Sequence, residues 1–98
     1  MNLQELTAKI DTKAKAHAPI GVKFKLNLVD AGIIFIDGTD GNKVSNDDKE
    51  ADCTLSISIP DFLDLAKGNL NPMAAFMGGK LKIDGDIGAA MKLQSFLS

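Results

Sequence analysis

The sequence predicts a single α+β domain, residues 1–98, in which helices cover one face of a sheet. Three observations predict it. Apolar residues first recur every three or four positions, as on one face of a helix. They then alternate with polar residues over four short segments between residues 22 and 58. After Pro60 the helical period returns, interrupted by one more alternating segment near Leu81. The composition, 45% hydrophobic and 24% charged, is that of an ordinary globular domain.

The first helix is expected over residues 2–17. Asn2 with Glu5 three positions later resembles a capping box, and Pro19 ends the segment. Its apolar face consists of Leu3, Leu6, Ile10 and Ala14.

Four strands are expected next, at residues 22–28, 33–37, 43–45 and 53–57. The first alternates cleanly, so one of its faces is predicted to be buried. In the second, Phe35 lies on the face opposite Ile34 and Ile36, so both faces of this strand are expected to be partly covered. The connections are short, which favours an antiparallel meander of these four strands. The polar run at residues 37–42 is interpreted as a solvated turn.

The second half predicts helices at residues 60–67 and 73–77, a last strand at 81–84 and a final helix at 87–97. The final helix is apolar over more than half of its circumference. The crossover helices, a second subunit or an apolar ligand must therefore cover its edge. Gln94 projects within this arc, either bonded to the backbone or as a polar group in an apolar pocket.

Composition excludes several classes of function. All 11 basic residues are Lys, Trp and Tyr are absent, and the net charge is −2, so nucleic-acid binding is not expected. No apolar run reaches the roughly 20 residues of a membrane span. The lone Cys53 and the absence of a secretory signal pattern at the start indicate a cytoplasmic location.

Catalytic and metal-binding motifs are also missing. His17 lies at a helix end, and Cys53 is interpreted as a buried structural thiol. The acidic turns at residues 37–42 and 47–52 lack calcium-ligand spacing, and the glycine pairs lack phosphate-loop spacing. We therefore predict no enzyme activity, no cofactor and no metal.

The second half resembles a known family. The residues that carry the resemblance are Ala51-Asp52-Cys53-Thr54-Leu55, Phe62-Leu63, Gly68, Asn71-Pro72, Ala75-Phe76, Gly79-Lys80-Leu81-Lys82-Ile83, Gly85 and Ala90-Met91-Lys92-Leu93-Gln94. This stretch resembles the sterol carrier protein type 2 family of nonspecific lipid-transfer domains. The resemblance implies a five-stranded mixed, mostly antiparallel sheet, covered on one face by helices, with an apolar tunnel between the two layers.

The resemblance also implies binding and carriage of fatty acids, fatty acyl-CoAs, phospholipids or sterol-like molecules, without covalent chemistry. Gln94 occupies the family's glutamine position on the final helix, where it would meet a polar part of the ligand. The peroxisomal tripeptide of many relatives is absent from the end, Ser95-Phe96-Leu97-Ser98. The lipid-binding residues implied by position are Phe24, Leu26, Ile34, Ile36, Phe62, Leu63, Met73, Phe76, Met77, Leu81, Ile83, Ile87, Met91, Gln94 and Leu97.

One alternative function stays open. The same fold with its interior filled by side chains would serve as a non-catalytic interaction or oligomerisation module. The two functions differ in what fills the tunnel, which is ligand in a carrier and side chains in an interaction module. Expected partners are a lipid or acyl-chain ligand and no nucleic acid, with the chain a monomer or weak dimer. Lys23 and Lys25 are a candidate face for transient membrane contact.

Overall fold

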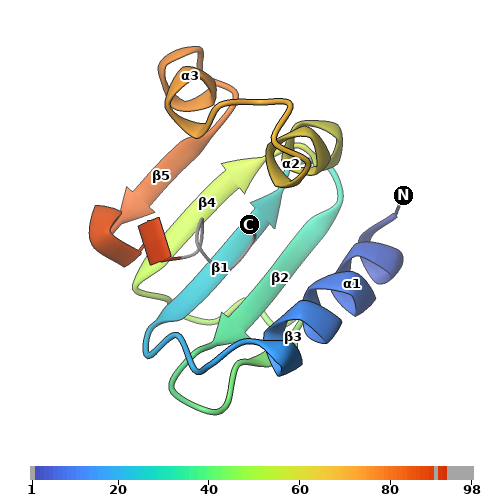
Figure 1. Ribbon diagram of the computed structural model, residues 1–98, viewed down its shortest axis with the longest axis vertical. Helices are drawn as coiled ribbons and strands as arrows, with labels where there is room; N and C mark the ends of the chain where they lie inside the picture. The colour runs from blue at the N-terminus through green and yellow to red at the C-terminus, as the bar shows by residue number, and fades with distance from the viewer. Residues whose placement is uncertain (1, 90, 93–98) are drawn as a thin grey trace.

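The computed structural model describes residues 2–89 and 91–92 (Figure 1). It confirms the α+β class and the order of elements expected from the sequence. The elements are α1 (Leu3–Ala16), β1 (Lys23–Leu28), β2 (Gly32–Asp37), β3 (Lys43–Ser45), β4 (Cys53–Ile57), α2 (Ile59–Ala66), α3 (Pro72–Met77) and β5 (Lys82–Gly85).

The five strands form one mixed sheet in the order β3-β2-β1-β4-β5. The predicted antiparallel meander is wrong for β4, which lies beside β1 and parallel to it, with Leu26 opposite Leu55. All other neighbours are antiparallel. The meander was inferred from short connections, but the seven-residue segment 46–52 is long enough to recross the sheet when extended, at about 3.3 Å per residue.

Segment 46–52 crosses the face of the sheet that the helices leave open (Figure 1). Lys25 Nζ on this face lies 2.7 Å from Asp48 Oδ1, and Lys49 Nζ lies 5.9 Å from the centre of the Phe35 ring. The backbone N–H of Asp52 then donates to Lys23 O at 2.9 Å. This cover explains why Phe35 is buried, and it confirms that both faces of β2 are covered.

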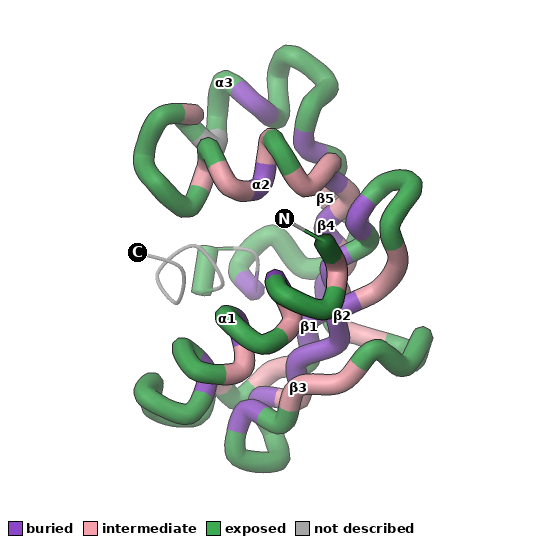
Figure 2. Tube along the Cα trace, turned by 90° about the vertical axis from the view of Figure 1, so that its right-hand side faces the viewer, coloured by how far each residue is buried: buried purple, intermediate pink, exposed green. Residues whose placement is uncertain are grey.

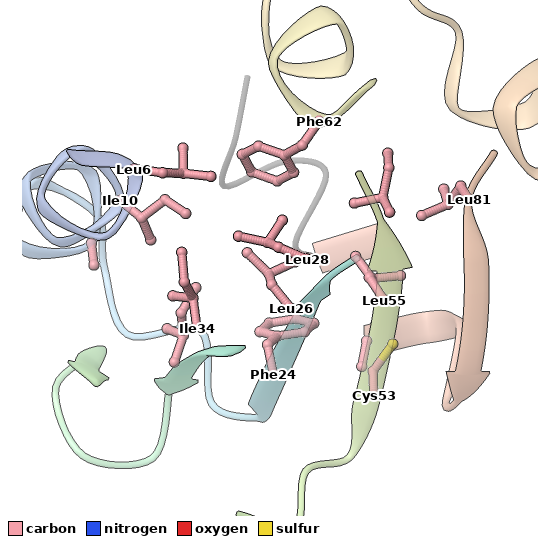
Figure 3. Close-up of a cluster of buried hydrophobic side chains, with 14 of the residues drawn as sticks. Leu6, Ile10, Phe24, Leu26, Leu28, Ile34, Cys53, Leu55, Phe62 and Leu81 are labelled. Carbon is pink, nitrogen blue, oxygen red and sulfur yellow. The ribbon is translucent and has the colours of Figure 1, made fainter. Parts of the chain in front are cut away.

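The helices lie on the other face of the sheet, where the apolar core forms (Figure 2). Leu6, Ile10 and Ala14 of α1 are buried against it, as the helical spacing predicts. Figure 3 shows Leu6 of α1 and Phe62 of α2 pointing toward one another above Leu26 and Leu28 of β1. These two helices therefore contact the core of this face from different sides.

The turn at residues 37–42 differs from its prediction. It was interpreted as solvated, but Asn42 is only 1% exposed. Its side chain reaches back to the end of α1 and the segment after it, which a sequence reading of the turn alone does not show. Elsewhere in this turn the Thr39 hydroxyl and N–H donate to Asp37 Oδ1, and these bonds hold the pKa of that carboxyl below its usual value.

The helices begin within one residue of their predicted starts. Asn2 Oδ1 accepts from Glu5 N at 2.8 Å, and Asn71 Oδ1 accepts from Met73 N at 2.8 Å. Asp86 Oδ1 accepts from Gly88 N at 2.9 Å, and residues 87–89 and 91–92 are helical. The remainder of the predicted final helix, including Gln94 and Leu97, lies outside the described residues. Within the described part of the chain, no helix combines the length and hydropathy needed to cross a membrane.

Candidate functional site

An apolar groove of about 200 Å³ lies between α1 and α2, over the helix-covered face of the sheet. Leu6 and Ile10 form the side from α1, and Phe62, Leu63 and Ala66 form the side from α2. Leu6, Ile10 and Phe62 also belong to the buried core, so the floor of the groove is continuous with the packed interior.

Local sequence places both walls. On α1, Leu6 and Ile10 are four residues apart, so they lie one turn apart on the same face. On α2, Ser58 Oγ accepts from Asp61 N at 3.3 Å and starts the helix one turn before Phe62. The helix ends with the N–H of Lys67 donating to Leu63 O at 3.0 Å. The two apolar faces are thereby turned toward each other above β1.

Lysines line the same groove. Lys9 and Lys13 of α1 and Lys67, the C-cap of α2, contribute to its wall. No acidic residue is among the described residues that line it. The groove therefore combines an apolar floor with a positively charged rim.

The structure distributes the predicted lipid-binding residues over three environments. Phe24, Leu26, Ile34, Ile36, Phe62 and Leu81 are buried in the core, and Leu63 and Ile83 are half-buried against it. Among the described members of the predicted set, only Phe62 and Leu63 line the groove. The exposed members are Met73, Phe76, Met77, Ile87 and Met91.

Helix packing explains why these large apolar side chains are exposed. In α3 the small Ala75 is the buried residue, with no exposed surface. Met73 and Met77 lie two positions to either side of it, and residues two apart on a helix face nearly opposite directions. Ala89 is buried in the same way between Ile87 and Met91. The small residues contact the core, and the large ones are exposed.

Sequence reasoning missed part of the groove wall. It placed Leu6 and Ile10 on a buried face but did not assign them to a site, and it did not select Lys9, Lys13, Ala66 or Lys67. The four-residue spacing of Lys9 and Lys13, beside an apolar face of equal spacing, was a usable signal. The pairing of α1 with α2 could not be predicted from the sequence, because it joins segments about fifty residues apart.

A second hollow of about 330 Å³ lies between α1 and β3. Its walls include Gln4, Thr7, Asp11 and Asn46 beside Leu3, Ala8 and Val44. Asn46 Nδ2 already donates to Thr7 Oγ1 at 3.1 Å and to Ile33 O at 2.9 Å, so it serves to join α1 to the sheet. The apolar groove between α1 and α2 is the better ligand site, because ligand pockets are predominantly apolar.

In the part of the chain that the structure describes, groups suited to covalent chemistry are not assembled. Burial, with the nearby Asp86 and Asp84 carboxylates, raises the pKa of the Cys53 thiol, which disfavours a reactive thiolate. His17 Nδ1 lies 2.7 Å from Ala18 O at the end of α1. Among the described residues, no three His, Cys, Asp or Glu side chains are placed to hold a metal ion.

The fold and groove define a small α+β domain with an apolar site between the helices that cover a five-stranded sheet. A model of the SCP-2 sterol transfer family matches residues 3–98, so the chain belongs to this family. The resemblance found in the sequence is thereby confirmed.

Individual relatives extend this result. Sterol carrier protein 2 from Homo sapiens is 53% identical over 55 residues, covering 56% of this chain and 10% of that protein. Hydroxysteroid dehydrogenase-like protein 2 from Mus musculus is 38% identical over 79 residues, covering 78% of this chain and 16% of that protein. The chain thus spans about a tenth of the length of the sterol carrier protein 2 relatives.

Solved structures agree in fold. The sterol carrier protein domain 2 of Helicoverpa armigera has a TM-score of 0.78 and 26% identity, covering 95% of this chain and 83% of that one. Sterol Carrier Protein-2 from Aedes aegypti, in complex with the C16 fatty acid palmitate, has a TM-score of 0.78 and 20% identity, covering 100% of this chain and 97% of that one.

Proposed function

We propose that this domain binds the alkyl chain of a lipid in the groove between α1 and α2 and carries it through water. The observation that carries the proposal is an apolar groove whose floor is continuous with the core. Membership of a sterol transfer family supports it, as does the palmitate bound by the relative from Aedes aegypti.

The energetics favour such a site. Each buried methylene contributes about 0.8 kcal/mol. The groove, at about 200 Å³, is smaller than the roughly 300–1,000 Å³ of most ligand pockets. We therefore expect α2 to move away from α1 when a long chain binds. Neither helix contributes to the strand ladder, so this movement breaks no sheet hydrogen bond.

Native mass spectrometry of the freshly purified protein, followed by organic extraction, tests the function directly. We expect a bound mass that extraction releases as a fatty acid, acyl-CoA or phospholipid. A ligand-free protein that also fails to bind added palmitate and oleoyl-CoA would refute the carrier function. That result would favour the alternative, an interaction module with a filled interior.

The position of the site is tested by Ala66→Trp, which places an indole in the groove. Ala66 is exposed at the end of α2, so the change is expected to leave folding intact and to weaken palmitate binding at least about tenfold, by excluding two or more methylenes. Ala74→Trp, on exposed α3 surface outside the groove, is the matched control and should bind normally. Equal binding by both variants would place the lipid elsewhere. Titration calorimetry measures the difference.

We also propose that α3 contacts a lipid surface during cargo exchange. Met73, Phe76 and Met77 are 66%, 47% and 80% exposed, an unusual concentration of large apolar side chains on one short helix. The earlier candidate face is less suitable, because Lys25 is only 19% exposed and is paired with Asp48.

Co-sedimentation with phosphatidylcholine vesicles tests this contact. Met73→Ser/Met77→Ser is expected to reduce the bound fraction about tenfold, because two side chains no longer enter the interface. Val29→Ser, at a 49% exposed position in the turn after β1, should leave the bound fraction unchanged. Equal loss in both variants, or in neither, would contradict a role for α3.

We further infer that the domain itself catalyses no reaction, because its described residues bring no nucleophile and base together. A cytoplasmic location and a monomeric or weakly dimeric state remain predictions. Fractionation of cells and analytical ultracentrifugation test them.

A further inference from the structure

We propose that the groove between α1 and α2 selects lipids with an anionic head group, a carboxylate or a phosphate, and that Lys9 and Lys67 hold this group at the rim. The proposal rests on lipid binding in the groove, as proposed above. It adds a chemical selection that the apolar floor alone cannot provide, because apolar contacts distinguish ligands only by their length and bulk.

The charge around the groove is opposite in sign to the net charge of the whole chain. The protein has 13 acidic and 11 basic residues, for a net charge of −2. The eight described residues that line the groove nevertheless include three lysines and no Asp or Glu. A local excess of this kind complements an anion and repels a cationic or zwitterionic ammonium.

The acidic residues of the two helices lie elsewhere. Asp11 of α1 lines the hollow beside β3, and its Oδ1 is 3.0 Å from Lys15 Nζ. Glu5 of α1 and Asp61 and Asp64 of α2 are likewise absent from the groove wall. Both helices therefore turn lysine toward the groove and carboxylate away from it.

Helix dipoles explain only part of this arrangement. Lys13 lies in the last turn of α1 and Lys67 caps α2, positions where positive charge is generally favourable. Lys9 lies in the middle of α1, where the dipole gives no such preference. All three lysines nevertheless line the groove.

The length of lysine suits the task. Its aliphatic stem packs along apolar surface while the ammonium group stays in water. Lys9 and Lys67 are exposed, whereas Leu6, Ile10 and Phe62 below them are buried. A lipid with its chain on the apolar floor would therefore present its head group at the level of the ammonium groups.

Three twelve-carbon ligands test the proposal by calorimetry below their critical micelle concentrations: laurate, dodecyl phosphate and dodecanol. We expect the two anions to bind at least about tenfold more tightly than the alcohol, with the preference shrinking as salt rises. A preference for one anion over the other identifies which head group the rim accepts.

The variant Lys9→Gln/Lys67→Gln should abolish the preference, so that this variant binds laurate, dodecyl phosphate and dodecanol with about equal affinity. Lys43→Gln/Lys82→Gln is the matched control, because these exposed strand lysines lie outside the groove, and it should retain the preference. Thermal unfolding verifies that both variants are folded.

The outcomes separate the two proposals. Binding of both anions no tighter than that of dodecanol by the wild-type protein, or an anion preference that survives Lys9→Gln/Lys67→Gln, would overturn head-group selection while leaving lipid binding intact. Binding of none of the three ligands would refute lipid binding itself.

Discussion

Replacing Asn42 by alanine is expected to lower the free energy of unfolding by about 2–4 kcal/mol, since several buried or partly buried backbone groups lose their partner. Asn42 Oδ1 accepts from Ile20 N at 3.0 Å. Its Nδ2 lies 3.2 Å from Ala14 O, 3.2 Å from His17 O and 3.1 Å from Ala18 O. This one side chain joins the turn before β3 to the end of α1.

Backbone conformation adds to the effect. Asn42 has φ of 59°, in the left-handed region that asparagine tolerates better than alanine. Asn42→Gly removes the hydrogen bonds but not the favourable conformation, so it isolates the side-chain contribution. Urea denaturation measures each variant.

Asn27→Ala is the matched control for Asn42→Ala. Asn27 is exposed on β1, and its Nδ2 donates to Ser56 Oγ at 3.3 Å. We expect a loss below about 0.5 kcal/mol there, as is usual for surface substitutions. A loss at Asn42 no larger than that at Asn27 would show that the buried hydrogen bonds contribute little.

Replacing Gly85 by alanine is expected to cost about 2–4 kcal/mol and to loosen β5. Gly85 lies opposite Cys53 in the β4–β5 pair and has φ of +102°. A Cβ there would lie 2.4 Å from the carbonyl oxygen of Asp52, which also accepts from Asp86 N at 3.0 Å. The clash is with backbone, so it cannot be relieved by turning a side chain.

Gly68→Ala separates strain from steric conflict. Gly68 has φ of +81°, but a Cβ there would contact nothing within 4 Å. We expect about 1 kcal/mol from conformation alone. Chemical denaturation compares the two variants, and hydrogen exchange of the β5 amides locates the damage. Equal losses of unfolding free energy in the two variants would show that the backbone clash is not the cause of the destabilisation at Gly85.

The local structure of this protein was largely predictable from sequence, because neighbouring residues determine it. Helical spacing predicted the buried face of α1, and alternation predicted the buried face of β1. The cap at Asn2 accepts from a group three residues away, so it too was visible in the sequence. The family motif, which includes Gly85, then indicated a five-stranded mixed sheet.

The location of the candidate site was only partly predictable. Phe62 and Leu63 were selected from the family pattern and do line the groove. Met73 and Met77 were selected as apolar, but Ala75 contacts the core in their place. Hydrophobicity indicates which residues prefer burial. How closely the helix packs against the core decides which of its sides is buried.

By itself the sequence determined the type of each described helix and strand, the fold class and the family of this protein. Only the tertiary structure decided that β4 pairs with β1, that Asn42 is buried, and that Lys9, Lys13 and Lys67 share one groove. The physical reason is distance along the chain. Periodicity and capping arise between residues a few positions apart, whereas strand order and groove walls join segments that only folding brings together.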